Sequence, residues 1–276
     1  MNHLTPFMCS IHTHTDFCDG KNTMEEMAEA AYKAGVRYYG VPGHSHTPAP
    51  QDKGFVLPCD MTEYRKKIME LKEKYSGKME VLSGLEWDIC SDAIRDGFDY
   101  WIGSVHYFQT GKDRYYPVDL SEDAFDVCRE EAFNGNIKTM VQAYFNQVSC
   151  MADLIPPVLG HMDLITKFNE GNRFFDENAE WYKEAALQAL HTVSPSKTVL
   201  EINTGAMARG YRKTPYPALF LLKEWYDMGG RVILTADAHS TEGIIYGYRI
   251  AVDHAKKAGF TTASVLTGKG LVECSL

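Results

Sequence analysis

Six histidines and three carboxylates in this chain stand at the ends of predicted strands or just after them. His12 and His14 are two residues apart, so on an extended strand both side chains leave the same face. The others are His44, Glu86, His106, His161, Asp237 and His239, with Asp19 in the polar turn that follows the first run. Imidazole and carboxylate ligands without cysteine suit Zn, Mn or Fe. We therefore predict a metal site.

The size of this set predicts two or three divalent ions. A catalytic ion takes three or four protein ligands and keeps one position open, whereas this chain offers nine candidates. At least one carboxylate must then bridge two ions, and Glu86, in the middle of the series, is the best candidate. Water bound to such an ion becomes hydroxide near neutral pH, and a second ion stabilises charge on a phosphoryl or carbonyl group. The chemistry expected is metal-assisted hydrolysis.

The predicted elements explain how such distant residues could meet. β-rich or apolar runs at 36–41, 79–85, 100–105, 155–160, 198–202 and 231–235 alternate with helical sequence. This alternation predicts an α/β fold with a mainly parallel sheet, and about seven units favour a barrel over a doubly wound sheet. The carboxyl ends of barrel strands open onto one face, where active sites lie. With no linker-like stretch, residues 1–276 are expected to form a single domain.

The connecting segments carry weaker signals. Thr23 and Glu26 match a capping box that opens a helix ending near Gly35. Segments 109–118 and 167–175 are polar and are expected to be loops, the second of them flexible. Asp163, two residues after His161, is the expected hydrogen-bond partner of that ligand. We assign ordinary structural positions to three other histidines, which are His3 near the terminus and His191 and His254 on polar helix faces.

Composition argues against several classes of partner. The chain has 28 Lys and Arg against 37 Asp and Glu, so its net charge of −9 disfavours binding to nucleic acid or to an anionic membrane. A local cationic pocket for one phosphate remains possible. No apolar run approaches the roughly 18 residues of a membrane span. The seven cysteines include no CxxC pair, so we expect a soluble cytoplasmic protein without disulfides.

The motifs, in this order, resemble those of the polymerase and histidinol phosphatase (PHP) superfamily. They are His12-Thr13-His14 with Asp19-Gly20, Pro42-Gly43-His44, Gly84-Leu85-Glu86, Ile102-Gly103-Ser104-Val105-His106, Gly160-His161-Met162-Asp163 and Ala236-Asp237-Ala238-His239. Glu201-Ile202-Asn203-Thr204-Gly205 and Arg209-Gly210-Tyr211-Arg212 resemble the histidinol-phosphatase branch. Trp87-Asp88-Ile89 and the additional His46 depart from the pattern, and both departures bear on the shape of the pocket.

The resemblance implies a distorted (βα)7 TIM-like barrel with a trinuclear site at the carboxyl ends of its strands. One ion would be held by His12, His14, Glu86 and Asp237, the second by Glu86, His106 and His161, and the third by Asp19, His44 and His239. The implied reaction is hydrolysis of L-histidinol phosphate to L-histidinol and phosphate in histidine biosynthesis, through a metal-activated hydroxide.

Further roles follow as hypotheses from this reading. Arg209 and Arg212 could clamp phosphate oxygens with their planar forks, although a solvated loop charge is the equal alternative for each. His46 is the third expected substrate contact. Glu86, Asp237 and His239 are the expected catalytic residues, although a metal ligand is a poor free acid.

Other activities remain open. A nucleotide or another small phosphate ester could be the substrate, since fold alone does not fix function. An amidohydrolase is less expected, because Glu86 occupies the place where such barrels often carry a modified lysine. A metal-dependent binding protein with a degenerate site is disfavoured, since no motif position is vacant. In each phosphatase reading the ligand is a small phosphorylated metabolite.

Overall fold

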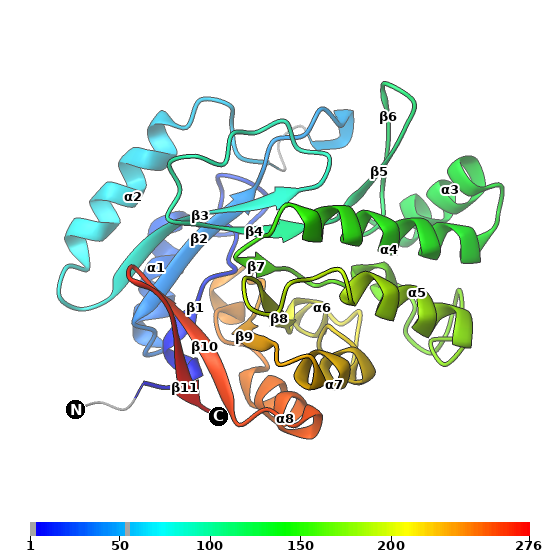
Figure 1. Ribbon diagram of the computed structural model, residues 1–276. Coiled ribbons are helices and arrows are strands. Elements are labelled where there is room, and N and C mark those ends of the chain that lie inside the picture. The colour runs from blue at the N-terminus through cyan, green and yellow to red at the C-terminus, as the bar shows by residue number, and fades with distance from the viewer. Residues whose placement is uncertain (1–3, 53–55) are drawn as a thin grey trace.

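The computed structural model describes residues 4–52 and 56–276, and its main feature is a curled sheet surrounded by helices (Figure 1). His3 lies outside the described residues. In sheet order the strands are β1 (Cys9–Ser10), β2 (Tyr38–His44), β3 (Glu80–Asp88), β4 (Tyr100–Ser104), β7 (Val158–Leu159), β8 (Val199–Asn203), β9 (Arg231–Thr235), β10 (Thr262–Thr267) and β11 (Gly270–Ser275). All neighbours pair in parallel except β10 and β11, which form an antiparallel hairpin.

The sheet curls so far that the segments after β1 and β9 meet. The amide of His14 donates to the carbonyl oxygen of Ala238 over 2.8 Å, and the amide of Ala238 donates to the carbonyl oxygen of His12 over 3.1 Å. Thr13 and Ala238 form an isolated parallel bridge. These backbone bonds hold the first and last predicted ligand motifs side by side.

Helices cover the outer face of the sheet (Figure 1). The described helices are α1 (Met24–Lys33), α2 (Thr62–Lys74), α3 (Glu122–Phe133), α4 (Ile137–Asp153), α5 (Glu180–Leu190), α6 (Gly205–Ala208), α7 (Leu219–Asp227) and α8 (Tyr248–Ala258). The capping box is confirmed, since Thr23 and Glu26 exchange side-chain-to-backbone hydrogen bonds of 3.2 and 3.0 Å at the start of α1. None of the described helices is both long and apolar enough to cross a membrane.

A separate apolar cluster fills the concave face of the sheet below the polar strand ends. It includes Ile11, Leu82, Ile102 and Val199, all buried, together with the ring of Tyr100. Because strand side chains alternate between faces, Val199 on the concave side places Glu201 on that side too. The polar cluster therefore stands on a packed apolar floor.

The Tyr100 ring needs glycine on the neighbouring strands. A Cβ atom at Gly84 would lie 2.5 Å from the tyrosine ring, and one at Gly40 would lie 2.1 Å from its hydroxyl oxygen. The hydroxyl donates to the carbonyl oxygen of Ile11. The missing side chains thus let β2, β3 and β4 pack closely around one buried aromatic residue.

The predicted α/β class and mainly parallel sheet are confirmed, but the seven βα units of the expected distorted (βα)7 barrel are not. No helix joins β3 to β4 in the described segment 89–99, and β10 adds a further parallel pairing at β9. Residues 109–118, expected to be a loop, belong largely to a hairpin of β5 (Tyr107–Thr110) and β6 (Arg114–Pro117). The strands of a hairpin pair with each other, so a polar or short segment can form a strand although its sequence pattern does not predict one.

Two other expectations are corrected. Segment 167–175 was expected to be flexible, yet Asn169 is buried and its side-chain oxygen accepts from the amides of Phe174 and Phe175. His254 was placed on a polar helix face, yet it is mostly buried and lies 2.9 Å from the carbonyl oxygen of Pro217. In both cases a hydrogen bond to the backbone lets a polar residue enter the interior.

Candidate metal centre

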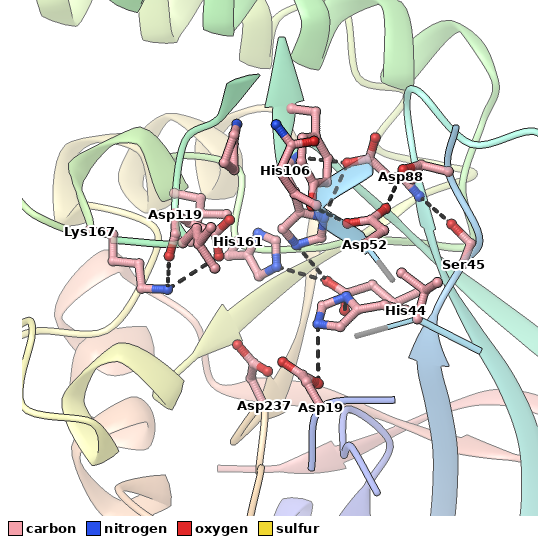
Figure 2. Close-up of a pocket in the computed structure, with 18 of the residues that line it drawn as sticks. Asp19, His44, Ser45, Asp52, Asp88, His106, Asp119, His161, Lys167 and Asp237 are labelled. Carbon is pink, nitrogen blue, oxygen red and sulfur yellow. Dashed lines mark hydrogen bonds and ion pairs between the residues drawn. The ribbon is translucent and has the colours of Figure 1, made fainter. Parts of the chain in front are cut away.

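The nine predicted ligands meet at the carboxyl ends of the strands. Among the described residues, four overlapping groups place one ligand atom of each member within 4.8 Å of the others. The groups are His14, Asp19, His44 and His239; His12, His14 and Asp237; His12, Glu86 and His161; and His44, Glu86 and His106. Figure 2 shows several of these side chains pointing toward one another. Residues separated by more than 200 positions therefore form one cluster.

Glu86 lies at the centre of this cluster, and its two oxygens face different histidines. Oε1 is 2.9 Å from Nε2 of His161 and 3.2 Å from Nε2 of His106. Oε2 is 2.8 Å from Nδ1 of His44, 3.3 Å from Nε2 of His12 and 3.4 Å from Nε2 of His14. A carboxylate whose two oxygens face separate groups of imidazoles has the geometry of a bridge between ions.

Orphaned buried atoms show that the cluster fits metal ions. Nε2 of His12 and His14, Oδ1 of Asp19 and Oε2 of Glu86 are buried and have no hydrogen-bond partner among the described residues. Buried polar atoms almost always have partners. These four belong to the ligand sets above, so an ion would satisfy them together.

The electrostatics of His14 and Glu86 agree with this fit. Burial, helped by the charges of His239 and His44, lowers the pKa of His14 to about 3. His14 is therefore the neutral imidazole that a metal requires. Burial alone would raise the pKa of Glu86, but the surrounding imidazoles, led by His12, hold it well below its ordinary value. Glu86 is therefore ionised and attracts positive charge.

The positions of Asp19 and Asp237 depend on two unusual backbone features. His239 Nε2 lies 3.1 Å from Oδ2 of Asp19, which is carried by a turn packed on the backbone of His14. A Cβ atom at Gly20 would lie 2.4 Å from that backbone, so glycine is needed to place Asp19 there. Asp237 has a φ of +47°, a left-handed conformation that Asp adopts more readily than most residues.

Glu201 is a supporting residue whose role the sequence reasoning missed. Its Oε1 accepts from Nδ1 of His12 over 2.5 Å and from the hydroxyl of Thr235 over 2.7 Å. Its Oε2 accepts from the backbone amide of His161 over 2.7 Å and from Nδ2 of Asn203 over 3.0 Å. Glu201 thus orients one ligand ring and positions the backbone of another. The available signal was its period-two spacing with Asn203 on the inward face of β8.

Asp163 is not the hydrogen-bond partner of His161 that the sequence predicted. Its Oδ2 accepts from the backbone amide of Ala218 over 2.8 Å, and no hydrogen bond among the described residues joins it to His161. Burial raises the pKa of Asp163 to about 6. Proximity in sequence was misleading, because the chain turns after His161 and carries Asp163 toward the start of α7.

Asp88 supports a second ligand. Its Oδ2 accepts from the backbone amide of His106 over 2.7 Å and lies 3.1 Å from Nδ1 of the same residue. This leaves Nε2 of His106 facing Glu86. Trp87, between Glu86 and Asp88, points to the other face and packs against Trp101. Of the first departure from the family motifs, Trp87 therefore lies outside the cavity, whereas Asp88 lines it.

A cavity of about 210 Å³ opens over the cluster. Besides ligands, its wall includes Thr47, Gln51, Asp52, Asp88, Tyr107, Asp119, Leu120, Lys167, Arg209 and Tyr211. Nη2 of Arg209 is 3.1 Å from Oδ2 of Asp237, and its Nη1 donates to Nδ1 of His239 over 2.8 Å. Arg209 therefore brings a cation to the edge of the ligand cluster.

The other two expected substrate contacts are not among the described residues that line this cavity. Arg212 donates to both carboxylate oxygens of Glu177, over 2.7 and 2.9 Å, and to the carbonyl oxygen of Thr166. His46 Nδ1 lies 2.7 Å from Oδ1 of Asp92, beside a separate surface pocket. The structure therefore brings Arg209 to the site but gives Arg212 and His46 other partners.

Comparisons with known proteins agree with this geometry. A family model described as "PHP domain" matches residues 10–205, more than half of the chain. A protein of Schizosaccharomyces pombe named "Probable histidinol-phosphatase" is 24% identical, over 93% of this chain and 89% of that protein. Proteins with the same name from Deinococcus radiodurans and Thermotoga maritima are 27% and 25% identical, over 93% and 98% of this chain and 96% and 100% of their own lengths.

Two solved structures are also similar. The first is described as a candidate histidinol phosphatase from Listeria monocytogenes; its TM-score is 0.73, with 20% identity over 87% of this chain and 98% of that one. The second is a histidinol phosphate phosphatase from Lactococcus lactis, complexed with zinc, L-histidinol and phosphate. Its TM-score is 0.68, with 21% identity over 96% of this chain and 99% of that one. At these identities the likeness shows a shared fold.

Proposed function

The chain belongs to the PHP domain family, and from this premise we propose that it is a phosphatase that hydrolyses L-histidinol phosphate to L-histidinol and phosphate. The observation that carries a metal-dependent reaction is the position of Glu86, with Oε1 facing two imidazoles and Oε2 facing three others. The choice of substrate is supported by the names of the curated relatives and by the Lactococcus complex.

The proposal includes three ions and their ligands. The sets are His12, His14, Glu86 and Asp237; Glu86, His106 and His161; and Asp19, His44 and His239. Divalent ions held there would supply Lewis-acid stabilisation of phosphoryl oxygens and activation of the attacking water. Zinc in the Lactococcus neighbour supports zinc as one candidate beside manganese and iron.

Two cations of this chain would act on the phosphoryl group. Arg209 borders the ligand cluster, and Lys167 lines the cavity near His161. Fixed positive charges there would neutralise the oxygens of the phosphoryl group as it transfers, which is the main requirement of this reaction. Arg209 carries a delocalised planar charge, whereas Lys167 acts as a point charge.

Two carboxylates would keep the ligands in place during the reaction. Glu201 holds His12 in one orientation, and Asp88 does the same for His106. The apolar floor beneath them excludes water from that side. We further propose that residues 1–276 form one domain, with a small phosphorylated metabolite as its ligand. Since all seven cysteines are free, the proposal places the protein in the cytoplasm.

Phosphate release from L-histidinol phosphate tests the proposal, beside a panel of nucleotide and sugar phosphates, with and without a chelator. We expect a kcat/KM of about 10⁴ M⁻¹s⁻¹ or more for L-histidinol phosphate alone, lost on chelation. Preference for a nucleotide would keep the metal centre and overturn the substrate. If no ester were hydrolysed by the metal-loaded protein, the phosphatase assignment itself would be wrong.

A further inference from the structure

The cavity contains a second charged pair beside the ligand cluster, formed by Asp119 and Lys167 (Figure 2). Asp119 precedes α3, and Lys167 follows the turn at 164–166. Nζ of Lys167 is 3.2 Å from Oδ2 of Asp119 and also donates to its backbone carbonyl oxygen. The side chain of Lys167 is 10% exposed and that of Asp119 is 25% exposed, so the pair is largely removed from solvent.

Lys167 is held firmly in this position. Its Nζ lies 5.4 Å from the ring centroid of Phe168 and 5.2 Å from that of Tyr211, within the range of cation–π attraction. The ammonium group is therefore fixed by two rings and one carboxylate. Burial would raise the pKa of Asp119, but Lys167, His106 and His161 keep it below its ordinary value. Asp119 is thus a negative charge in a cavity where a phosphate must bind.

A carboxylate in that place opposes a phosphate unless a cation comes with the substrate. L-Histidinol phosphate brings one, because its ammonium and its phosphate ester are on neighbouring carbon atoms. The substrate therefore carries a short pair of opposite charges, and the cavity wall carries another. Phosphate beside Lys167 and ammonium beside Asp119 would pair all four charges.

Hydrogen bonding distinguishes Asp119 from the other carboxylates of the wall that are not proposed ligands. Asp52 uses both oxygens, for the hydroxyls of Thr47 and Tyr107. Asp88 also uses both, for His106 and the amide of Cys90. Among the side-chain oxygens of Asp119, only Oδ2 accepts a hydrogen bond from residues 4–52 and 56–276. Its Oδ1 is therefore left for a donor from the substrate.

We propose that Asp119 determines specificity by receiving the ammonium group of the substrate, while Lys167 faces the phosphate. The inference rests on the proposed function and deepens it. It explains how an acidic wall would favour an amino-alkyl phosphate over nucleotides and sugar phosphates, which present a phosphate without a neighbouring ammonium group.

The test compares L-histidinol phosphate with its desamino analogue, 3-(imidazol-4-yl)propyl phosphate, which keeps every group except the amine. The wild-type protein should hydrolyse the analogue with a kcat/KM lower by about 10- to 100-fold, the range expected for one charge-assisted hydrogen bond. Asp119→Asn should lower kcat/KM for L-histidinol phosphate by a similar factor and leave the value for the analogue unchanged or higher. Asp113→Asn, at the exposed tip of the β5–β6 hairpin, is the matched control and should change neither.

Each other outcome overturns the inference. Equal losses on both substrates would show that Asp119 supports the fold or the metal centre, and metal content and Tm would be measured alongside. Equal rates of the wild-type protein on the two esters would exclude amine selection while leaving the proposed function intact, and this arm needs no folded variant. If the wild-type protein hydrolysed neither ester, the proposed function and this inference would fail together.

Discussion

Replacing Glu201 by glutamine is the sharpest test of how the ligand cluster is held. The substitution keeps the size of the side chain but converts one acceptor oxygen into an NH₂ donor. Glu201 accepts four hydrogen bonds, two on each oxygen. Two of them must therefore be lost, whichever way the amide turns. One orientation removes the partner of His12 Nδ1, and the other removes the partner of the His161 amide.

The magnitude follows from these contacts. Loss of a partner that orients a metal-binding histidine typically lowers metal affinity by about 10- to 100-fold, which corresponds to about 1.4–2.7 kcal/mol. A buried donor left without an acceptor costs about 1–3 kcal/mol of stability. Since about 1 kcal/mol shifts Tm by roughly 2–4 °C in a chain of this size class, the metal-free variant should melt several degrees below the wild-type protein.

The assay measures both quantities on metal-stripped protein. Zinc affinity is obtained by competition with a chromophoric chelator, and Tm by circular dichroism without metal. Glu224→Gln is the matched control, because Glu224 pairs with His191 over 2.7 Å and both side chains are more than a third exposed. Such an exposed pair contributes about 0–1 kcal/mol. If Glu201→Gln matched this control in zinc affinity and Tm, the orienting role of Glu201 would be refuted.

Three further predictions concern other parts of the molecule. Glu86→Gln should lose bound metal and phosphatase activity while staying folded, and a chelator should do the same to the wild-type protein. Metal content and turnover are measured on the variant. Bound metal together with near-normal turnover in Glu86→Gln would contradict the bridging role of Glu86. Arg212→Ala should lower Tm by several degrees through loss of its bidentate pair with Glu177, at about 1–3 kcal/mol, with KM changed less than about twofold; a tenfold rise in KM at constant Tm would instead show a substrate contact. The pKa of Asp99 is below its ordinary value. Burial alone would raise this pKa, but the hydrogen bond that Asp99 accepts from Lys72 helps to lower it. Asp99 therefore stabilises the fold above about pH 4 and loses this effect as the pH falls, so the Tm deficit of Asp99→Asn should be present at pH 7 and vanish in acid.

The sequence alone was sufficient for the α/β class and for the candidate ligands. His44 and Glu86 end β-rich runs, and the structure places both at the carboxyl ends of their strands. Strand periodicity also gave His12 and His14 a common face. These properties are local, because they depend on the two-residue repeat and on the side chain at a strand end. The Thr23–Glu26 capping box is local in the same sense.

Tertiary structure decided which side chains form hydrogen bonds to those candidate ligands. Asp163 is near His161 in sequence, yet Glu201, forty residues away, binds the backbone of His161. Arg209 and Arg212 are in one loop, yet only Arg209 among the two lines the cavity. Such choices depend on how far a sheet curls and which way a turn leaves a strand. Both are set by packing between distant segments. For example, the backbone hydrogen bond between His14 and Ala238 joins the segment after β1 to the segment after β9 at one site.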